Sequence, residues 1–279
     1  MNSPAVQVEF AALSDPGKVR DNNEDHYLVA RFERSMQSLL TNLTLGQLPG
    51  SFEQEGYMML VADGVGGAAA GEVASGTAIG LLVELALKTP DWIMKFDGES
   101  GREVLSRTEE RFRKIGEAFV ERAKTEPALA GMGTTMTLAG SVGADALIAH
   151  VGDSRAYLAR QGTLHRLTKD QTVAQTLADS GAISLEEAEK HPSRHILTSA
   201  LTTQKGMVSV EMRHLRLQDG DQLLLCSDGL TDMADEKAIA KTLGRERSAE
   251  KTCRALVDLA LDGGGQDNVT VVLARYRIP

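Results

Sequence analysis

The sequence has 279 residues, of which 42% are hydrophobic and 25% are charged, as is ordinary for a soluble globular protein. Its 39 acidic and 30 basic residues give a formal net charge of −9, which argues against the basic surface needed to bind nucleic acids or anionic membranes. Two cysteines, Cys226 and Cys253, are too few for a disulfide framework or a cysteine-rich zinc site.

The first half of the chain combines strand patterns with two long helical patterns. Strands are predicted over Val6–Leu13 and Tyr57–Ala62. Helical spacing predicts a helix over Glu72–Lys88, which stops at Pro90, and an amphipathic helix over Arg102–Lys124.

The second half is predicted to consist mainly of short strands. Runs separated by glycine-containing breaks predict an antiparallel meander: Thr134–Ala139, Ala146–Val151, Ala156–Ala159 and Thr163–Leu167. Val208–Leu217 and Asp221–Ser227 flank Gln218-Asp219-Gly220, which predicts a hairpin. A helix over Ala249–Leu261 and a strand over Val269–Tyr276 complete the chain.

Antiparallel neighbours with long inserted helices imply an α+β fold rather than a βαβ fold. No repeat, low-complexity tract or Pro/Ser-rich linker divides the sequence, so we expect a single domain over residues 1–279. Two segments look irregular, the polar Gln37–Glu55 and the charged Lys169–Gln204. A long excursion inside a compact domain is usually functional or mobile.

The sequence carries no recognisable targeting segment. Met1–Phe10 lacks a basic region followed by an apolar run, so we expect no signal peptide. The nearest approach to a membrane span, Ile79–Leu87, is too short and contains Glu84. We therefore expect a cytoplasmic protein with reduced thiols and no membrane partner.

Acidic residues stand at the ends of predicted strands. Asp63 and Asp228 directly follow apolar runs, Asp153 follows Gly152, and Asp267 precedes the last strand. Another pair, Glu24-Asp25, precedes an apolar stretch over residues 27–30.

These carboxylates have two readings. Asp-Gly is a common hairpin dipeptide, and this reading suffices for Asp219-Gly220; Asp262-Gly263 reads as a helix stop. If the other strand ends meet, however, their carboxylates would repel and their pKa values would rise. A cluster of hard oxygen ligands is what Mg²⁺ or Mn²⁺ requires, so a divalent metal site is predicted.

Seven short segments, in this order, resemble the motifs of the metal-dependent (PPM, type 2C) serine/threonine protein phosphatases, bacterial type. They are Gly17–Asp25, Val61–Gly67, Gly133–Thr135, Val151–Arg155, Leu167–Asp170, Cys226–Asp232 and Gln266–Thr270. Each alone is weak, but seven in family order over about residues 8 to 275 are specific. The resemblance implies a four-layer α-β-β-α sandwich, in which two facing antiparallel sheets hold metals in a channel at one end.

The resemblance also implies an activity. It is the hydrolysis of phosphoserine and phosphothreonine in proteins, by a hydroxide that bridges two Mn²⁺ or Mg²⁺ ions and attacks phosphorus in line. Phosphorylated proteins would be the partners, with a Ser/Thr kinase opposed by this signalling enzyme. We expect a monomer.

Residue roles follow from the same resemblance. Asp63 would bridge the two metals, and the Gly64 carbonyl would ligate one of them. Asp228 and Asp267 would complete the first metal.

The remaining roles surround this core. Glu24 and Asp25 would hold the second metal largely through water. Arg20 would bind the substrate phosphate through its bidentate guanidinium. Asp153 together with Asp228 matches a third, weaker metal position.

Some positions depart from the family pattern. Many eukaryotic members have a histidine, proposed as general acid, where this chain has Val65, so the proton donor is unassigned. His191 and His195 lie in the expected flap over residues 169–204 and are predicted to be exposed surface histidines. The interval from Asp25 to Asp63 is longer than in compact bacterial members. These changes concern substrate selectivity and the flap, not the metal core.

The same fold also allows two other functions. A noncatalytic phosphoprotein-binding regulatory module on the same fold predicts lost ligands at positions 63, 228 or 267, and none is lost. An enzyme of this fold that acts on a non-protein phosphate ester, or on one dedicated phosphoprotein in sporulation-type signalling, is compatible with the sequence.

Overall fold

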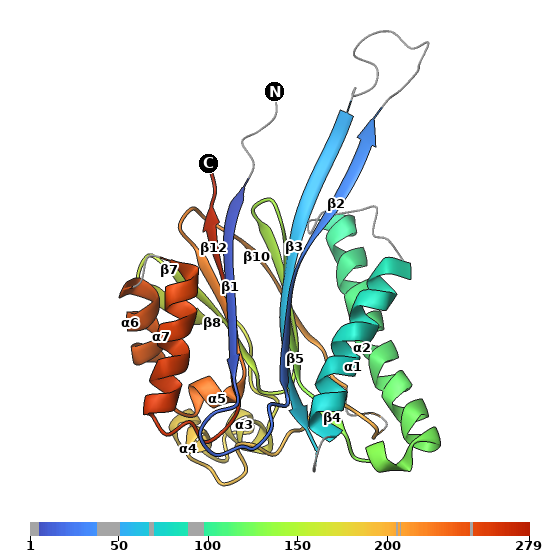
Figure 1. The fold of residues 1–279 in the computed structure, drawn as a ribbon, viewed down its shortest axis with the longest axis vertical. Coiled ribbons are helices and arrows are strands. Elements are labelled where there is room, and N and C mark those ends of the chain that lie inside the picture. Colours follow the sequence, from blue (N-terminus) through green and yellow to red (C-terminus); the bar gives the residue numbers. More distant parts are fainter. Residues whose placement is uncertain are drawn as a thin grey trace.

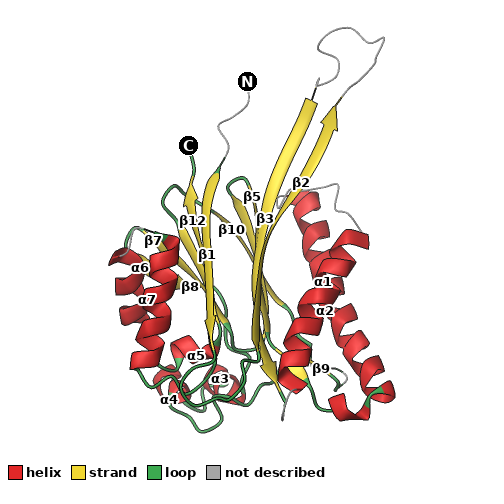
Figure 2. Cartoon of the chain, viewed as in Figure 1, coloured by secondary structure: helices red, strands yellow, loops and turns green. Residues whose placement is uncertain are grey.

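Two antiparallel β-sheets face each other, and helices cover their outer faces (Figures 1 and 2). The computed structural model describes residues 6–37, 51–66, 70–88, 98–204, 206, 208–245 and 248–279. The expected four-layer α+β sandwich is confirmed.

The first sheet contains the first and the last strand of the sequence. Its strands, in spatial order, are β1 (Gln7–Asp15), β12 (Val269–Arg277), β11 (Gln222–Cys226), β7 (Arg155–Arg160) and β8 (Thr163–Arg166). β1 pairs with β12 along its whole length, from Gln7 opposite Arg277 to Asp15 opposite Val269. Because β11 pairs with the other edge of β12, the last strand lies inside the sheet.

The second sheet is built mainly from the middle of the chain. Its order is β10 (Glu211–Arg216), β6 (Asp145–Val151), β5 (Met136–Val142), β3 (Ser51–Val65), β4 (Gly133–Thr134) and β9 (Leu201–Thr202), and β2 (Asp25–Gln37) pairs with β3. The pairing of β2 with β3 places Asp25 directly opposite Asp63.

Helices form the outer layers. Two long ones, α1 (Ala70–Lys88) and α2 (Gly98–Thr125), cover the second sheet, and α6 (Glu236–Arg245) and α7 (Ala249–Asp262) cover the first. Shorter helices are α3 (Val173–Asp179) and α4 (Leu185–Glu189) in the flap, α5 (Asp228–Thr231) after β11, and a 3₁₀ turn over Pro127–Leu129.

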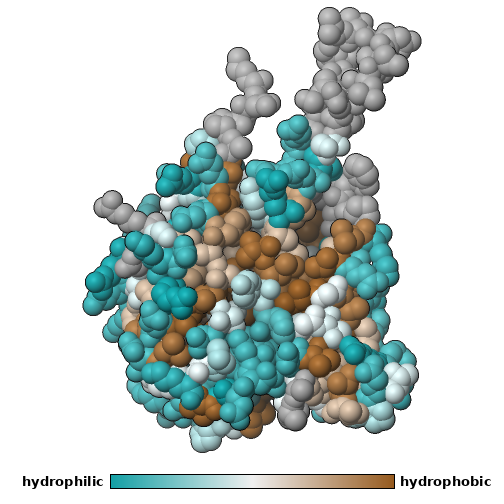
Figure 3. All heavy atoms as spheres, in the orientation of Figure 1, coloured by the Kyte–Doolittle hydropathy of each residue, from teal (hydrophilic) through white to brown (hydrophobic). Residues whose placement is uncertain are grey.

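Three apolar layers hold the sandwich together. Between the sheets, Val61 and Ile148 of one sheet pack in the same cluster as Leu225 and Val272 of the other. The outer layers join each sheet to its helices, for example Leu60 with Phe112 of α2. Figure 3 shows apolar side chains along the band between the sheets, with hydrophilic ones over α6 and α7. Successive side chains of a strand point to opposite faces, so each sheet contributes both to the layer between the sheets and to an outer layer.

The strand pairing differs from the sequence prediction in two places. The predicted meander is interrupted, because β6 and β7 belong to different sheets. The chain crosses between them at Gly152, whose φ of +111° favours glycine. As a result, Asp153 lies at the junction between the sheets.

The predicted hairpin around Asp219-Gly220 is also wrong, since β10 pairs with β6 and β11 pairs with β7 and β12. The turn is real, but it joins two sheets. Asp221 accepts a hydrogen bond from the Gln218 N–H (2.7 Å) and forms an ion pair with Arg160 of β7 (2.6 Å). The ion pair ties this turn to the first sheet.

The two segments expected to be irregular contain regular structure. β2 reaches Gln37 and β3 begins at Ser51, so the ends of the interval 37–55 are strand, and residues 38–50 lie outside the described residues. In the flap, Thr172 caps α3 by accepting from the Gln175 N–H, and Ser184 forms a capping box with Glu187 at α4.

Within the described residues, α1 alone is long and apolar enough to cross a membrane, judged by length and composition. Its Ala74, Ala78 and Leu82 side chains pack in the core layer beneath the second sheet. These are the contacts of a covering helix in a sandwich.

Candidate metal centre

The acidic residues singled out in the sequence converge at one end of the sandwich, the lower end in Figure 1. Asp63 comes from the end of β3, and Asp25 lies opposite it at the start of β2. Asp228 follows β11, Asp153 follows β6, and Asp267 precedes β12. Together these residues are called the acidic cluster below. All four others raise the pKa of Asp63, so these strand ends meet, which is the condition under which a metal site was predicted.

Burial and mutual repulsion shape the electrostatics of the acidic cluster. Burial, followed by the charges of Asp25 and Asp228, raises the pKa of Asp63 well above its ordinary value. Burial raises the pKa of Asp25 to about 7, although Ser227 donates a hydrogen bond to it. Burial and Asp228 also raise the pKa of Asp153. The cluster is therefore short of positive charge.

The backbone around Asp63 is fixed by two threonines. Thr135 donates its N–H to the Asp63 carbonyl (2.9 Å) and accepts the Asp63 N–H at Oγ1 (3.1 Å). Thr134 Oγ1 also donates to that carbonyl (2.8 Å). These bonds leave only the Asp63 carboxylate to point into the acidic cluster.

Ser227 and Asn268 have supporting roles that the sequence did not reveal. Ser227 Oγ donates to Asp25 Oδ2 (2.6 Å), and Asp25 Oδ1 is buried with no hydrogen-bond partner among the described residues. Asn268 Oδ1 accepts the Glu24 N–H (2.8 Å), which ties Glu24 to the start of β12. Ser227 precedes Asp228 and Asn268 follows Asp267 in the sequence, and only this adjacency points to their roles.

Gly64 packs against the first turn of α1. A Cβ atom at Gly64 would lie 2.1 Å from the Gly71 carbonyl oxygen, so no larger residue fits without a backbone shift. A Cβ at Gly71 would lie 2.9 Å from the Gly64 carbonyl oxygen and 2.4 Å from a carboxylate oxygen of Glu24. The Gly64 carbonyl and the Glu24 carboxylate thus flank the same space, which only glycine at position 71 leaves open.

Arg20 lies at the rim of the acidic cluster. Its guanidinium pairs with Asp267 (2.7 Å), and the two side chains are 57% and 36% exposed. The pKa of Arg20 is raised chiefly by its hydrogen bond to Asp267. Glu24 lies close enough that Arg20 partly offsets the rise in its pKa caused by burial.

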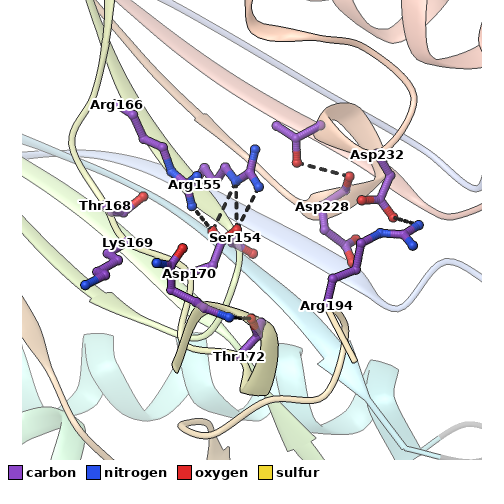
Figure 4. A network of polar contacts seen from close by, with 12 residues as sticks. Ser154, Arg155, Arg166, Thr168, Lys169, Asp170, Thr172, Arg194, Asp228 and Asp232 are labelled. Carbon is purple, nitrogen blue, oxygen red and sulfur yellow. Dashed lines mark hydrogen bonds and ion pairs between the residues drawn. The ribbon is translucent and has the colours of Figure 1, made fainter. Parts of the chain in front are cut away.

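The flap brings a histidine to the acidic cluster. His195 is exposed, as predicted, but it faces acids rather than open solvent: its Nδ1 lies 3.6 Å from Asp228 Oδ2 and its Nε2 lies 3.4 Å from Asp232 Oδ2. Asp228 is the main cause of the raised pKa of His195. Arg194, from the same flap segment as His195, lies beside Asp232 (Figure 4). Its Nη2 is 3.8 Å from Asp232 Oδ2. Sequence spacing gave no signal for this approach.

A partly buried ion-pair network attaches the start of the flap beside Asp153 (Figure 4). Arg155 donates through Nε and Nη2 to Asp170 (3.0 and 2.7 Å), and Arg166 also pairs with Asp170. Although burial alone would raise it, the pKa of Asp170 is lowered because these two guanidinium groups favour its charged form.

The donor set suits a hard divalent cation. Carboxylates from five chain positions surround this region, whereas Arg20 and His195 lie at its rim and Arg155 is paired with Asp170. The buried Asp25 oxygen without a partner and the space kept open at Gly71 are further signs of a missing charge. Oxygen ligands of this kind suit Mg²⁺ and Mn²⁺.

Comparison with known proteins gives an independent result. The family model described as "Protein phosphatase 2C" matches residues 50–259. The chain is 40% identical over 268 residues to the serine/threonine protein phosphatase PstP of Mycobacterium tuberculosis, covering 96% of this chain but only 45% of the relative. It thus spans about half the length of that relative.

A second relative and a solved structure match over nearly their full lengths. The serine/threonine phosphatase stp of Listeria welshimeri is 34% identical, with 95% of this chain and 94% of the relative covered. The crystal structure of the catalytic domain of PstP in complex with two manganese ions is 35% identical, with a TM-score of 0.74 and 98% and 99% of the two chains covered.

Proposed function

Because the chain belongs to the protein phosphatase 2C family, we propose that it is a metal-dependent phosphatase that hydrolyses phosphoserine and phosphothreonine in proteins. The observation that carries this proposal is the convergence of the acidic cluster from both sheets, with a buried Asp25 oxygen left without a partner. Residues 1–279 would act as one phosphatase domain, which is supported by the pairing of β1 with β12.

The residues present suit two core cations, Mn²⁺ or Mg²⁺. Asp63, Asp228 and Asp267 would hold the first, and the Gly64 carbonyl, which flanks the same space as the Glu24 carboxylate, would ligate one of the two. Glu24 and Asp25 would hold the second, with Asp63 shared between them. When bound, such cations supply Lewis-acid chemistry: they activate a water for in-line attack on phosphorus and withdraw charge from the phosphate oxygens.

The side chains of this protein supply positioning and charge. Arg20 is more than half exposed and pairs with Asp267 at the rim, so its guanidinium can turn to a substrate phosphate and bind two of its oxygens. Ser227 orients Asp25 by donating to one of its oxygens. Val65 is 37% exposed near Asp63, and because its side chain has no ionisable proton it contributes no acid catalysis.

We expect the substrates to be phosphoproteins produced by a Ser/Thr kinase that this enzyme opposes in the cytoplasm. The net charge of −9 disfavours nucleic acids and anionic membranes as partners. The monomer predicted from the sequence is part of this proposal.

The test is turnover of a phosphothreonine peptide by the purified chain with Mn²⁺ and with excess chelator. Activity should require the metal and should fall at least 100-fold in Asp228→Asn. Asp258→Asn, which changes an exposed acid on α7, is the matched control and should retain activity. Chelator-insensitive turnover, or full activity in Asp228→Asn, would contradict the proposal.

The noncatalytic alternative makes a different prediction in the same experiment. A phosphoprotein-binding module would retain the peptide without releasing phosphate. A panel of phosphoproteins and small phosphate esters would also separate a protein phosphatase from an enzyme specific for a non-protein ester.

A further inference from the structure

We propose that His195 of the flap is a cation ligand, which completes a third divalent-metal site together with Asp153 and Asp228. This inference rests on the proposed function only in that it uses the same metal centre. The two aspartates match a metal position by resemblance, and the new element is a nitrogen ligand supplied by the flap.

The geometry of the three side chains suits one cation. One ligand atom from each of Asp153, His195 and Asp228 lies within 4.8 Å of the others, and the His195 Nδ1 to Asp228 Oδ2 distance is 3.6 Å. Two ligands at about 2.1 Å from a shared cation lie roughly 3 to 4.2 Å apart. Because no pair exceeds 4.8 Å, a closure of at most about 0.6 Å would bring all three into range.

Asp232 fixes which nitrogen of His195 is available. It faces Nε2 at 3.4 Å, on the opposite side of the ring from Asp228. Histidines that bind metals usually donate their other N–H to a carboxylate, which sets the tautomer and the ring orientation. In the metal-bound form, a proton on Nε2 held by Asp232 would leave the Nδ1 lone pair free to bind the cation beside Asp228.

Asp153 supplies a buried oxygen donor that lacks another partner. It is 8% exposed, and within the described residues its carboxylate has no hydrogen-bonding or ion-pair partner other than its own backbone amide. Arg155, the nearest base in the chain, is occupied by Asp170. A cation held between the junction of the sheets and the flap would give Asp153 its missing partner.

A mixed nitrogen and oxygen site has a definite metal preference. Mg²⁺ favours oxygen ligands only, whereas Mn²⁺ accepts imidazole and binds N/O sites more tightly. The third site should therefore prefer Mn²⁺ over Mg²⁺ more strongly than the all-oxygen core. Because His195 lies on the flap and Asp153 on the sandwich, occupancy of this site would also hold the flap against the sheets.

Pulsed electron paramagnetic resonance of the Mn²⁺-loaded full chain tests the ligand directly. We expect nitrogen couplings from a bound imidazole in the wild type. They should disappear in His195→Gln and persist in His191→Gln, the control on the same flap. Couplings that survive in His195→Gln, or that are absent in the wild type, would overturn the assignment.

Calorimetric titration with Mn²⁺ alone separates this proposal from the metal core. His195→Gln should lose the weakest binding step and keep the core steps, and Asp232→Asn should weaken that step by about 10- to 100-fold. Asp63→Asn should instead abolish the core steps. If His195→Gln titrates as the wild type does, the third-site proposal fails while the core stands; if the wild type binds no Mn²⁺, the proposed function fails with it.

Discussion

Two positions of the metal centre, 64 and 71, have room only for glycine. Gly64 follows Asp63 and touches the backbone of Gly71, so the first turn of α1 approaches the metal centre through a contact between two residues without side chains. The position of Glu24 depends on the same contact, because its carbonyl accepts the Gly64 N–H (3.2 Å).

Substituting Gly64 by alanine should therefore destabilise the fold and impair the centre. The added Cβ would lie 2.1 Å from the Gly71 carbonyl oxygen, and overpacking of this kind costs about 1–3 kcal/mol. Thermal unfolding and Mn²⁺ affinity should both decrease. Gly80→Ala, on the exposed face of α1 with no atom within 4 Å of its Cβ, is the control and should raise the unfolding temperature slightly. Equal effects of the two substitutions would contradict this account.

His150 predicts a dependence of stability on pH. It is fully buried between Thr137 and the Lys169 carbonyl, and burial lowers its pKa to about 4, with Asp170 and Arg166 as the nearby charges. The unfolded chain protonates this histidine below about pH 6.5, whereas the native protein does so only near 4. Its contribution is thus complete above pH 6.5 and is lost as the pH falls towards 4.

Urea unfolding should show this loss as about 2 kcal/mol between pH 7 and pH 5. His150→Gln should have a smaller pH dependence by that amount. The difference between the two proteins isolates His150 from Asp25, whose raised pKa acts in the opposite direction. Parallel pH profiles for the two proteins would exclude His150 as the source.

At the scale of single residues, the sequence pointed to the residues of the acidic cluster but not to the side chains that contact them. Asp63 and Asp228 stand directly after apolar runs, and strand ends are visible in a one-dimensional pattern. The approach of His195 to Asp232 depends on how the flap folds back over α5, which no local spacing encodes. Ser227 likewise depends on a neighbour more than 200 positions away, Asp25.

At the scale of elements, the flap is attached more firmly than its irregular sequence suggests. Its first residues lie against β7 through the Arg155–Asp170–Arg166 network, and Gln171 exchanges hydrogen bonds with Gly152 (2.8 and 2.9 Å). The flap and the junction that carries Asp153 therefore form one unit.

Arg155→Met should break this unit. Removing Arg155 leaves Asp170, which is 15% exposed, paired with Arg166 alone, and should cost at most about 3 kcal/mol. Denaturant unfolding should show this loss, and the double variant Arg155→Met/Asp170→Asn should be less destabilised than the sum of the single variants. Strict additivity would mean that the two residues do not stabilise each other.

The elements themselves were largely predictable, and their pairing was not. Apolar periodicity located the strands near β6 and β11 and the helices near α1, α2 and α7. Chain proximity then suggested pairings of β6 with β7 and of β10 with β11, and both are wrong because the chain changes sheet at Gly152 and at Asp221. A turn signal shows that the chain bends but not which sheet it enters next.

At the scale of the whole molecule, the acidic cluster opposes folding until a cation binds. Saturating Mn²⁺ should raise the unfolding temperature by several degrees, since a ligand at 100 times its dissociation constant contributes about 2.7 kcal/mol. Chelator should reverse the shift. Thermal unfolding monitored by circular dichroism measures both.

Asp63→Asn should separate repulsion from metal binding. At pH 8 without metal, this variant should be at least as stable as the wild type, because it removes a carboxylate whose pKa is raised by burial and by four neighbouring acids. It should also lose the stabilisation by Mn²⁺. A metal-free variant less stable than the wild type would show that Asp63 has a structural role beyond charge.

The position of β12 in the middle of the first sheet has a consequence for biosynthesis. Residues 269–277 follow all the other described strands in the sequence, yet β1 has no other partner strand in this sheet among the described residues, and β11 lacks one of its two neighbours until they arrive. The first sheet is therefore incomplete on the ribosome until this strand has left the exit tunnel. Such long-range pairing slows folding and leaves strand edges open in the meantime. A nascent chain of this protein should therefore depend on chaperones until residues 269–277 have emerged.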